Sequence, residues 1–366
     1  AELDEGNIYE ALLEGAKHNL KNCWWIIDYN RQSLDGIIHG KLFEKIISLF
    51  ELMGWNVEIL KYGKKLESLK KTVSGNKILK WIDDCPNDLF SALTYQGGIE
   101  WRNSLNNSFS NDEEVLSLIK KYNDSDLHSL MTNLAGHDLS SLEEKFSKYK
   151  KDSTPTCFIC YTVKGFGLPL AGHKDNHSGI MNLEQFRSYQ QKMNVNKGKE
   201  WDKVEGIKTT LPQFESFISN NVLSNSKKSR IMEDEKVIIP SIENININKN
   251  ISTQEVFGKL LNELGKKNDD SIKRIITTSP DVTVSTNLGG WVNQKNIFST
   301  FKKSDIFGDK KVFSAQKWKY VPDGQHIELG IAENNLFLLL ASLGISDKIF
   351  GKRIIPIGTI YDTFIS

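Results

Sequence analysis

The sequence has few cysteines, almost no net charge and no long apolar run, and each scarcity excludes a class of protein. Four cysteines in 366 residues are too few for a disulfide-based scaffold. Basic and acidic residues number 47 and 46, for a formal net charge of +1, which argues against a dedicated nucleic-acid or membrane-surface protein. The longest apolar runs, such as residues 336–343, are too short to cross a bilayer. We therefore expect a globular chain with no nucleic-acid or membrane partner.

Two of the cysteines, Cys157 and Cys160, form a CxxC pair within a strand-like stretch, residues 156–163. Residues three apart on a strand point to opposite faces of the sheet. A redox or zinc site would need a helix start or a second pair of ligands. We expect these cysteines to be buried thiols in a reducing compartment.

Apolar residues alternate along the chain between a helical and a strand-like spacing. The helical spacing covers residues 7–22, 40–53, 253–264 and 326–343, and the strand-like runs are residues 24–28, 55–60, 155–164 and 272–278. This alternation predicts an α/β fold with parallel sheets. Residues 83–111, rich in Asn, Gly and Ser, predict an irregular segment, and residues 285–320 predict a long loop.

The composition shifts to Ser, Asn and Lys between residues 207 and 250, which is typical of a domain linker. We therefore expect a first domain of residues 1–206 and a second of residues 251–366. The chain does not begin with Met, and a strand-like segment lies close to its end. We expect the first domain to lack its N-terminal part and the second its C-terminal part.

A polar turn with Asn30, Arg31 and Gln32 follows the first strand-like run. Ligands of open α/β sheets bind outside the carboxyl ends of the strands, so this amide pair suits a metal or phosphate site. Asn also favours turns for purely local reasons. A plain turn therefore remains an alternative interpretation of the same residues.

Further polar residues follow the other strand-like runs. Glycines at 165 and 167 follow the third run and precede His173 and His177, for which a zinc site would require a helix and a third ligand. Asp281 follows a strand-like run in the second half, and Glu333 lies among apolar residues. A solvated loop histidine and a glutamate at a helix N-terminus are the simpler interpretations. We expect Asp138 or Ser140 to cap the helix at residues 142–149.

These segments occur in the order found in one known family. Residues 1–7 followed by residues 28–32 resemble the later parts of the thiamine-diphosphate motif, which runs Gly-Asp-Gly or Gly-Asp-Ala, a helix, then Asn. Residues 164–167 with the two histidines, residues 277–281 and residues 325–333 resemble further blocks. The family is the homodimeric-type first, decarboxylating component of pyruvate dehydrogenase, in the transketolase superfamily. The resemblance implies two transketolase-like, thiamine-diphosphate-binding domains with parallel sheets.

The resemblance also implies thiamine diphosphate and Mg²⁺ as cofactors. Mg²⁺ would bridge the diphosphate to oxygen ligands, with Asn30 supplying its amide oxygen and Gln32 the third ligand. The family's aspartate ligand belongs to a Gly-Asp pair that would precede Ala1. Glu333 would be catalytic, because it would hydrogen-bond a pyrimidine nitrogen of the cofactor and share a proton with it.

The remaining site residues are also implied by the resemblance. His177 would be catalytic by stabilising an oxyanion of the substrate, and His173 would contact the cofactor or its diphosphate. Tyr361 and Phe364 would pack on the pyrimidine ring, although aromatic residues near a strand end are often simply core. Asp281 would line the cofactor site.

The implied function is oxidative decarboxylation of pyruvate or a similar 2-oxo acid, with acyl transfer to a lipoyl-bearing acyltransferase component. Asn30 of one chain and Glu333 of another would meet across a homodimer interface. The family works in the bacterial cytoplasm or the mitochondrial matrix. Two alternatives remain: ketol transfer of the transketolase type, and a non-catalytic subunit derived from the enzyme.

Overall fold

The computed structural model describes residues 2–33, 37, 42–150, 153–221, 237–238 and 250–365. The chain divides into two compact units. Residues 21–210 form the first unit, and residues 2–20 with residues 211–366 form the second. Within the described residues, no helix is both long and apolar enough to span a bilayer.

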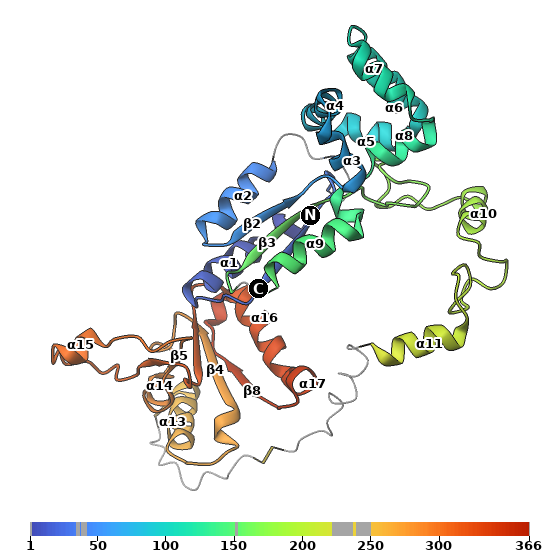
Figure 1. Ribbon diagram of the computed structural model, residues 1–366. Coiled ribbons are helices and arrows are strands. Elements are labelled where there is room, and N and C mark those ends of the chain that lie inside the picture. The colour runs from blue at the N-terminus through green and yellow to red at the C-terminus, as the bar shows by residue number, and fades with distance from the viewer. Residues whose placement is uncertain are drawn as a thin grey trace. The chain divides into compact units, whose positions relative to one another are not determined.

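The first unit is built on a parallel three-stranded sheet with the order β1-β3-β2 (Figure 1). The strands are β1 (Trp24–Tyr29), β2 (Asn56–Leu60) and β3 (Thr156–Tyr161). All six residues of the central strand β3 are buried. Its Cys160 is in register with both Asp28 and Leu60, so the three strands end at the same edge of the sheet.

Helices cover both faces of this sheet, because neighbouring strand residues point to opposite sides. Trp25 packs against Phe50 of α2 (Leu42–Leu52), with ring centroids 5.4 Å apart. Trp24 lies on the other face, 5.5 Å from Phe146 of α9 (Leu139–Tyr149). Strand β1 therefore contributes to the core on both faces of the sheet.

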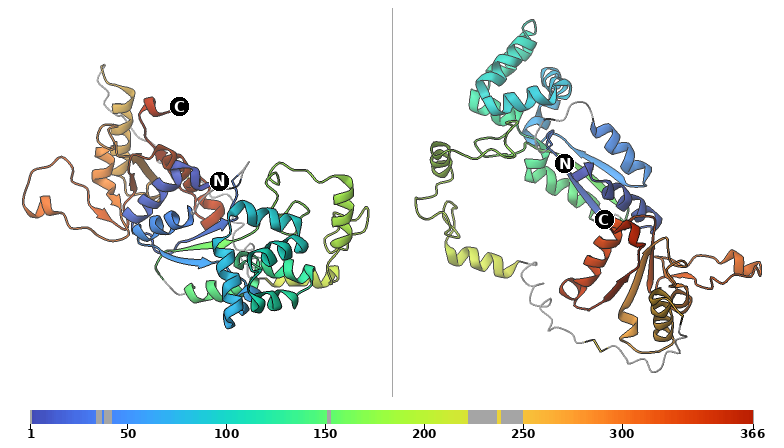
Figure 2. Two further views of the ribbon diagram at one scale, coloured as in Figure 1. Left: turned by 90° about the horizontal axis from the view of Figure 1, so that it is seen from above. Right: turned by 180° about the vertical axis from the view of Figure 1, so that it is seen from behind.

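A group of short helices connects β2 to β3 and gathers in one cluster in both views of Figure 2. They are α3 (Lys64–Ser68), η2 (Leu69–Lys71), α4 (Val73–Asp84), α5 (Asn87–Gln96), α6 (Gly98–Ser108), α7 (Glu113–Lys120), α8 (Asp124–Met131) and η3 (Ala135–His137). The expectation that residues 83–111 are irregular is wrong, because α5 and α6 occupy most of this segment. After β3 comes α10 (Leu183–Lys192), which buries none of its residues.

The second unit contains a parallel five-stranded sheet with the order β6-β5-β7-β4-β8. The strands are β4 (Ile275–Pro280), β5 (Ile297–Phe298), β6 (Tyr320–Val321), β7 (His326–Leu329) and β8 (Ile355–Gly358). The helices are η1 (Glu2–Asp4), α1 (Gly6–Lys17), α11 (Leu211–Asn220), α13 (Thr253–Gly265), η4 (Ile272–Arg274), α14 (Gly289–Lys295), α15 (Ile306–Asp309), α16 (Glu333–Gly344), α17 (Ser346–Phe350) and η5 (Asp362–Phe364).

In the second unit, α13 and α14 lie on one side of the sheet and α16 on the other (Figure 1). The core on the α13–α14 side includes Leu261, Trp291 and Ile275, all at most 1% exposed. On the α16 side, Asn335 donates a hydrogen bond of 3.1 Å to Glu10 of α1.

Two sequence-based boundaries in this unit are corrected by the structure. Residues 326–343 are not one helix, because His326–Leu329 pair in parallel with β4 and the helix begins at Glu333. Residues 285–320 are not one long loop, since they contain α14, β5 and α15. The predicted α/β class with parallel sheets is confirmed in both units.

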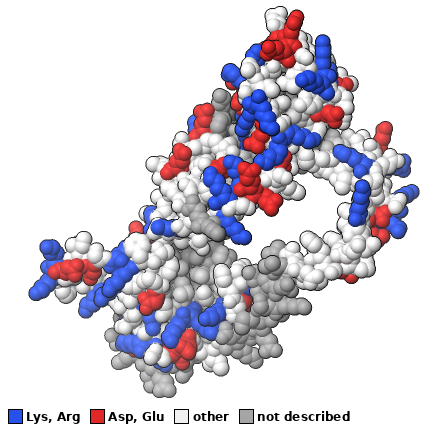
Figure 3. Space-filling view, in the orientation of Figure 1, with Lys and Arg blue, Asp and Glu red and all other residues white. Residues whose placement is uncertain are grey.

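Lys, Arg, Asp and Glu are interspersed over the described residues on the face shown in Figure 3. No side of this face carries a field of one sign, in keeping with the balanced composition of the sequence.

Candidate functional site

The polar turn that follows β1 is held by the side chain of Asn30. Its Oδ1 accepts a hydrogen bond of 3.0 Å from the backbone N–H of Gln32. Arg31 between them adopts a φ of 65°, a left-handed conformation that costs a non-glycine residue about 1–2 kcal/mol. The turn interpretation is therefore confirmed for Asn30, and the ligand interpretation of Asn30 and Gln32 stays a prediction.

The loop after β3 lies against this turn, since β1 and β3 are neighbouring parallel strands. Gln32 is 5% exposed, and its Nε2 donates a hydrogen bond of 3.1 Å to the carbonyl of Gly172. Lys164 donates to the carbonyl of Ser33 at 2.7 Å. A Cβ at Gly172 would lie 2.9 Å from the carbonyl oxygen of Ser91, so only glycine lets this backbone come so close.

Two buried amide oxygens in this region have no hydrogen-bond partner among the described residues. They are Oε1 of Gln32 and Oδ1 of Asn176. The Nδ2 of Asn176 donates to the carbonyl of Lys164 at 2.9 Å, which fixes the orientation of its amide. An unsatisfied buried acceptor costs about 1–3 kcal/mol, and a hard cation such as Mg²⁺ would satisfy it. Neutral oxygen donors are thus present for Mg²⁺, although no carboxylate is among the described residues that line the cavity of Asn30 and Gln32.

Arg31 is the one buried arginine of the described chain, at 4% exposed. Its guanidinium carbon lies 4.0 Å from the centroid of the Phe90 ring, and its Nε has no hydrogen-bond partner in the described part of the chain. Burial lowers the pKa of the guanidinium. A desolvated cation–π contact contributes about 2 kcal/mol, whereas leaving a buried charge uncompensated costs about 3–5 kcal/mol. The aromatic ring alone therefore does not balance the burial of Arg31.

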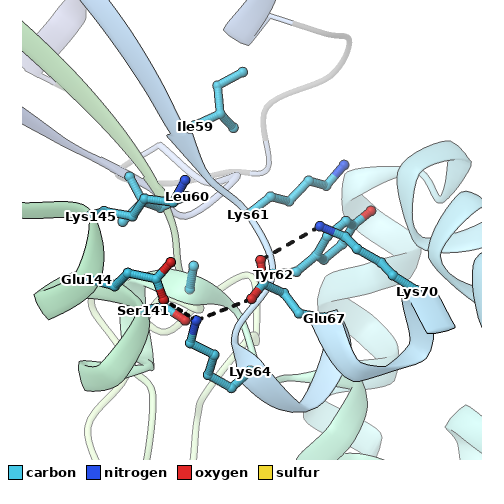
Figure 4. A pocket seen from close by; sticks show the side chains of 11 residues that line it. Ile59, Leu60, Lys61, Tyr62, Lys64, Glu67, Lys70, Ser141, Glu144 and Lys145 are labelled. Carbon is cyan, nitrogen blue, oxygen red and sulfur yellow. Dashed lines mark hydrogen bonds and ion pairs between the residues drawn. The ribbon is translucent and has the colours of Figure 1, made fainter. Parts of the chain in front are cut away.

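A second cavity of about 260 Å³ lies at the carboxyl end of β2 (Figure 4). Four lysines line it, and each has a carboxylate partner. These pairs are Lys61 with Asp83, Lys64 with Glu144 and Glu67, Lys70 with Glu67, and Lys145 with Glu58. Carboxylates already neutralise the lysine charges of this cavity. The cavity therefore has no excess positive charge that would favour an anionic ligand.

The two predicted histidines lie in the loop after β3 in different environments. His173 is half-buried, and the edge of its ring meets Tyr95 with centroids 4.6 Å apart. Its Nδ1 accepts a hydrogen bond of 3.1 Å from the backbone of Asp175. His177 is exposed. The structure thus gives His173 a local structural role and leaves the imidazole of His177 open to solvent.

A third histidine of this region, His137, was not identified from the sequence. Its Nε2 accepts a hydrogen bond of 2.8 Å from the backbone of Val163, and its ring stacks on Phe166 with centroids 3.9 Å apart. Burial lowers the pKa of His137. His137 therefore positions the glycine-containing loop, a role that no sequence spacing indicates because Val163 and Phe166 come from a distant segment.

The residues predicted from the second half of the chain lie in the second unit. Glu333 is the half-buried first residue of α16. Asp281, with φ 62°, is exposed directly after β4. Tyr361 and Phe364 are 40% and 53% exposed, with ring centroids 6.3 Å apart, so neither is a core residue. The hydroxyl of Tyr361 is hydrogen-bonded to Ser285.

A buried polar network next to Asp281 was also missed by sequence reasoning. His326 of β7 is fully buried, and its two ring nitrogens lie 2.8 Å from the hydroxyls of Thr277 and Thr283. Glu328 accepts hydrogen bonds from Ser279 at 2.8 Å and from the backbone N–H of Asp281 at 3.0 Å. Glu328 faces a cavity of about 390 Å³. The network fixes the backbone of Asp281 at the end of β4.

Comparisons with curated proteins find relatives of one kind that are similar over most of this chain. No family model matches the sequence. The pyruvate dehydrogenase E1 component of Cupriavidus necator is 23% identical over 99% of this chain and 42% of its own length. The E1 component of Escherichia coli K12 is 23% identical over 91% of this chain and 38% of its own length.

The chain resembles pyruvate dehydrogenase E1 components over most of its length. It spans less than half of the length of these E1 relatives. Among solved structures, it is similar to transketolase from Campylobacter jejuni, with a TM-score of 0.47 and 13% identity over 98% of this chain and 41% of that one. For transketolase from Leishmania mexicana the values are 0.43 and 16%, over 99% and 42%.

Proposed function

We propose that this chain is part of an E1-type component that uses thiamine diphosphate and Mg²⁺ to decarboxylate pyruvate or a close 2-oxo acid. It would pass the acyl group to a lipoyl-bearing acyltransferase component of a multienzyme complex. The observation that carries the proposal is the similarity to E1 components over 99% of the chain. The compartment would be the bacterial cytoplasm or the mitochondrial matrix, as for the family.

The first unit would hold the metal and the diphosphate. Asn30 would give its amide oxygen to Mg²⁺ and Gln32 would be a further ligand, supported by their place at the carboxyl end of β1 and by the unsatisfied Oε1 of Gln32. Asn176, whose Oδ1 is also unsatisfied, is a further oxygen donor. His173 would contact the diphosphate from the loop after β3.

The second unit would hold the pyrimidine ring. Glu333 would hydrogen-bond a ring nitrogen, because a half-buried carboxyl at the start of an apolar helix can share a proton with it. Tyr361 and Phe364 would contact the ring, and Asp281 would line the site. The bound cofactor supplies the electron sink for the bond that breaks when carbon dioxide leaves. The exposed imidazole of His177 would stabilise the negative charge on the substrate oxygen.

A homodimer would complete this site. Exposed apolar residues on and around α16 support an interface there, since a surface helix rarely exposes so many. They include Ile331, Phe337, Leu338 and Phe350, all at least 50% exposed.

The test is to measure carbon dioxide release from pyruvate and ketol transfer between sugar phosphates on the intact protein. We expect release without ketol transfer. Glu333→Gln should keep cofactor binding, measured by calorimetry, and lower turnover by about a hundredfold or more. Glu113→Gln changes the first residue of another helix, α7, and should leave turnover unchanged.

The opposite outcomes identify the alternatives. Ketol transfer without carbon dioxide release would point to a transketolase. If calorimetry shows no heat of binding for thiamine diphosphate and Mg²⁺, the chain would be part of a non-catalytic subunit. Undiminished turnover of the Glu333 variant would make that residue structural.

A further inference from the structure

The loop after β3, residues 162–182, is anchored at its base by Val163. The N–H of Val163 donates a hydrogen bond of 2.8 Å to Nε2 of His137, and its carbonyl accepts one of 3.0 Å from the N–H of Phe166. The ring of Phe166 lies flat on the imidazole, with an interplanar angle of 13°. His137 therefore contacts both ends of the turn that opens this loop.

His137 is itself held by the ends of two strands of the first unit. It is the last residue of η3, and the N–H of Ala135 in this helix donates to the carbonyl of Lys61, directly after β2, at 3.1 Å. A Cβ at Gly136 would lie 2.7 Å from the carbonyl oxygen of Tyr161, the last residue of β3. Only glycine thus allows η3 to pack so closely on the end of β3. The imidazole is therefore placed by the neighbouring strands β2 and β3, and the loop takes its anchor from it.

The anchored base of the loop carries the contacts that reach the turn after β1. The carbonyl of Lys164 accepts hydrogen bonds from the N–H of Gly172 at 3.1 Å and from Nδ2 of Asn176 at 2.9 Å. Its ammonium group donates to the carbonyl of Ser33, and the carbonyl of Gly172 accepts from Gln32. A shift at the base of the loop would therefore be transmitted to the amide groups of both Asn176 and Gln32.

The hydrogen bond from Val163 requires a neutral imidazole. A protonated imidazole carries a hydrogen on both ring nitrogens and has no acceptor left. Burial lowers the pKa of His137, and Asp28 of β1, the charged group of the described chain that acts on it, has the opposite effect. Protonation would strengthen the contact with the ring of Phe166, but it would place two N–H groups against each other at Nε2. The imidazole is thus neutral at physiological pH and releases the loop as acid protonates it.

We propose that His137 is a positioning residue of the cofactor site, whose neutral imidazole holds the loop after β3 in the conformation that receives the diphosphate. It would act through Val163 and Lys164 and would not touch the cofactor itself. The proposal deepens the proposed function and rests on it only for the identity of the ligand. It adds a pH dependence to cofactor binding, because the affinity would fall as the imidazole is protonated.

The first test is hydrogen exchange of the 366-residue chain, measured by mass spectrometry on peptides from residues 162–182 and corrected for intrinsic rates. His137→Phe keeps a flat ring for Phe166 but has no acceptor, so exchange in this loop should be roughly tenfold faster. His137→Gln offers its amide oxygen to Val163 and should restore most of the protection. The control is His128→Phe, the same change at a half-buried histidine of α8, which should leave exchange in this loop unchanged.

Acidification separates the role of the neutral imidazole from that of its volume. Between about pH 7.5 and pH 5, the loop of the wild type should lose protection, whereas His137→Gln, which does not titrate, should keep it. This comparison also decides the matter if His137→Phe does not fold. Equal exchange of wild type and His137→Phe, or an equal loss of protection in wild type and His137→Gln, would overturn the proposal.

The second test measures the KM for thiamine diphosphate on the intact protein. His137→Phe should raise this KM roughly tenfold and change kcat little, whereas a purely structural defect would reduce the amount of active enzyme and therefore kcat. An unchanged KM together with a loosened loop would overturn the link to the cofactor. If the wild type neither binds thiamine diphosphate nor releases carbon dioxide from pyruvate, the proposed function fails, and hydrogen exchange still decides whether His137 holds the loop.

Discussion

At the scale of single residues, the pair of buried His326 and half-buried Glu328 is held by hydroxyl groups on neighbouring segments. The ring nitrogens of His326 reach Thr277 and Thr283, and Glu328 reaches Ser279. Such a network favours folding only when its members are satisfied, because each unmet buried group costs about 1–3 kcal/mol. Both ring nitrogens of His326 have a hydroxyl partner, which explains how a fully buried histidine is tolerated in the middle of a sheet.

The network predicts a dependence of stability on pH. Burial alone would raise the pKa of Glu328, but hydrogen bonds from His326, Thr283 and Ser279 outweigh it, and the pKa is lowered. A carboxyl group with a lowered pKa in the folded state stabilises fully above its unfolded pKa, and this contribution is lost as the pH falls. The free energy of unfolding, from urea titrations between about pH 6 and pH 3.5, should therefore fall more steeply for wild type than for Glu328→Gln.

Glu328→Gln should also reduce the free energy of unfolding at neutral pH by about 1–3 kcal/mol. The control is Glu263→Gln, which breaks a surface pair with Lys266 and should keep the wild-type pH dependence. A Glu328 variant with the wild-type slope would contradict the assignment of this pH dependence to the network.

The candidate site illustrates which residues the sequence can predict. Asn30 and Gln32 were identifiable because they directly follow an apolar strand. The surroundings of Arg31 and the unsatisfied oxygen of Asn176 were not, because they depend on packing between distant segments. The hydrogen bond from Gln32 to Gly172 joins residues 140 positions apart, and no local pattern encodes such a contact.

At the scale of elements, Asp138 links two helices. One carboxylate oxygen caps α9 by accepting from the N–H of Ser141 at 3.0 Å. The other accepts from the N–H of Lys64, at the start of α3, also at 3.0 Å. These hydrogen bonds lower the pKa of Asp138 despite some burial. Asp138 thus satisfies one backbone N–H group at the start of each of two helices.

Asp138→Ala should lower the free energy of unfolding by about 0.5–2 kcal/mol, the range measured for loss of an N-cap. Ser140→Ala is the matched control, because Ser140 is exposed and does not cap the helix. Denaturation with urea, followed by far-UV circular dichroism, measures both variants. Equal stability of the two would show that the Asp138 hydrogen bonds are not stabilising.

The elements missed from the sequence have a common physical cause. Helices α5 and α6 are separated only by Gly97, whose φ is 95°, so the apolar period breaks between Phe90 and Trp101. Conversely, β7 and α16 were merged because a strand residue such as Leu329 continues the helical period of the residues that follow. Contacts between distant segments decide both cases, and the spacing of apolar residues along the sequence does not reveal them.

At the scale of the whole molecule, the alternation of helix and strand sufficed to predict parallel α/β units. The unit to which α1 belongs was not predictable in the same way. This helix precedes β1 in the chain, but it packs on α16, and Asn335 contacts residues of α1 more than 300 positions earlier. Contacts at such separation arise from chain topology, which local patterns do not contain.

The proposed homodimer makes a prediction about mixed molecules. If each site combines Asn30 of one chain with Glu333 of the other, a dimer of Asn30→Ala and Glu333→Gln chains has one doubly altered site and one intact site. Equal co-expression of the two variants of the intact protein should then restore about a quarter of wild-type activity, because half of the dimers are mixed and each has one working site.

The readout is carbon dioxide release from pyruvate, first by the co-expressed mixture and then by mixed dimers isolated with two different affinity tags, which should have about half of wild-type activity. Each variant alone should be nearly inactive. Activity is therefore recovered only if each site combines residues from both chains. If one chain supplies both residues to the same site, mixed dimers contain no intact site and remain as inactive as the parents. A control in which Glu333→Gln chains pair with Asn30→Ala, Glu333→Gln chains leaves no intact site under either geometry, and it fixes the background against which recovery is judged.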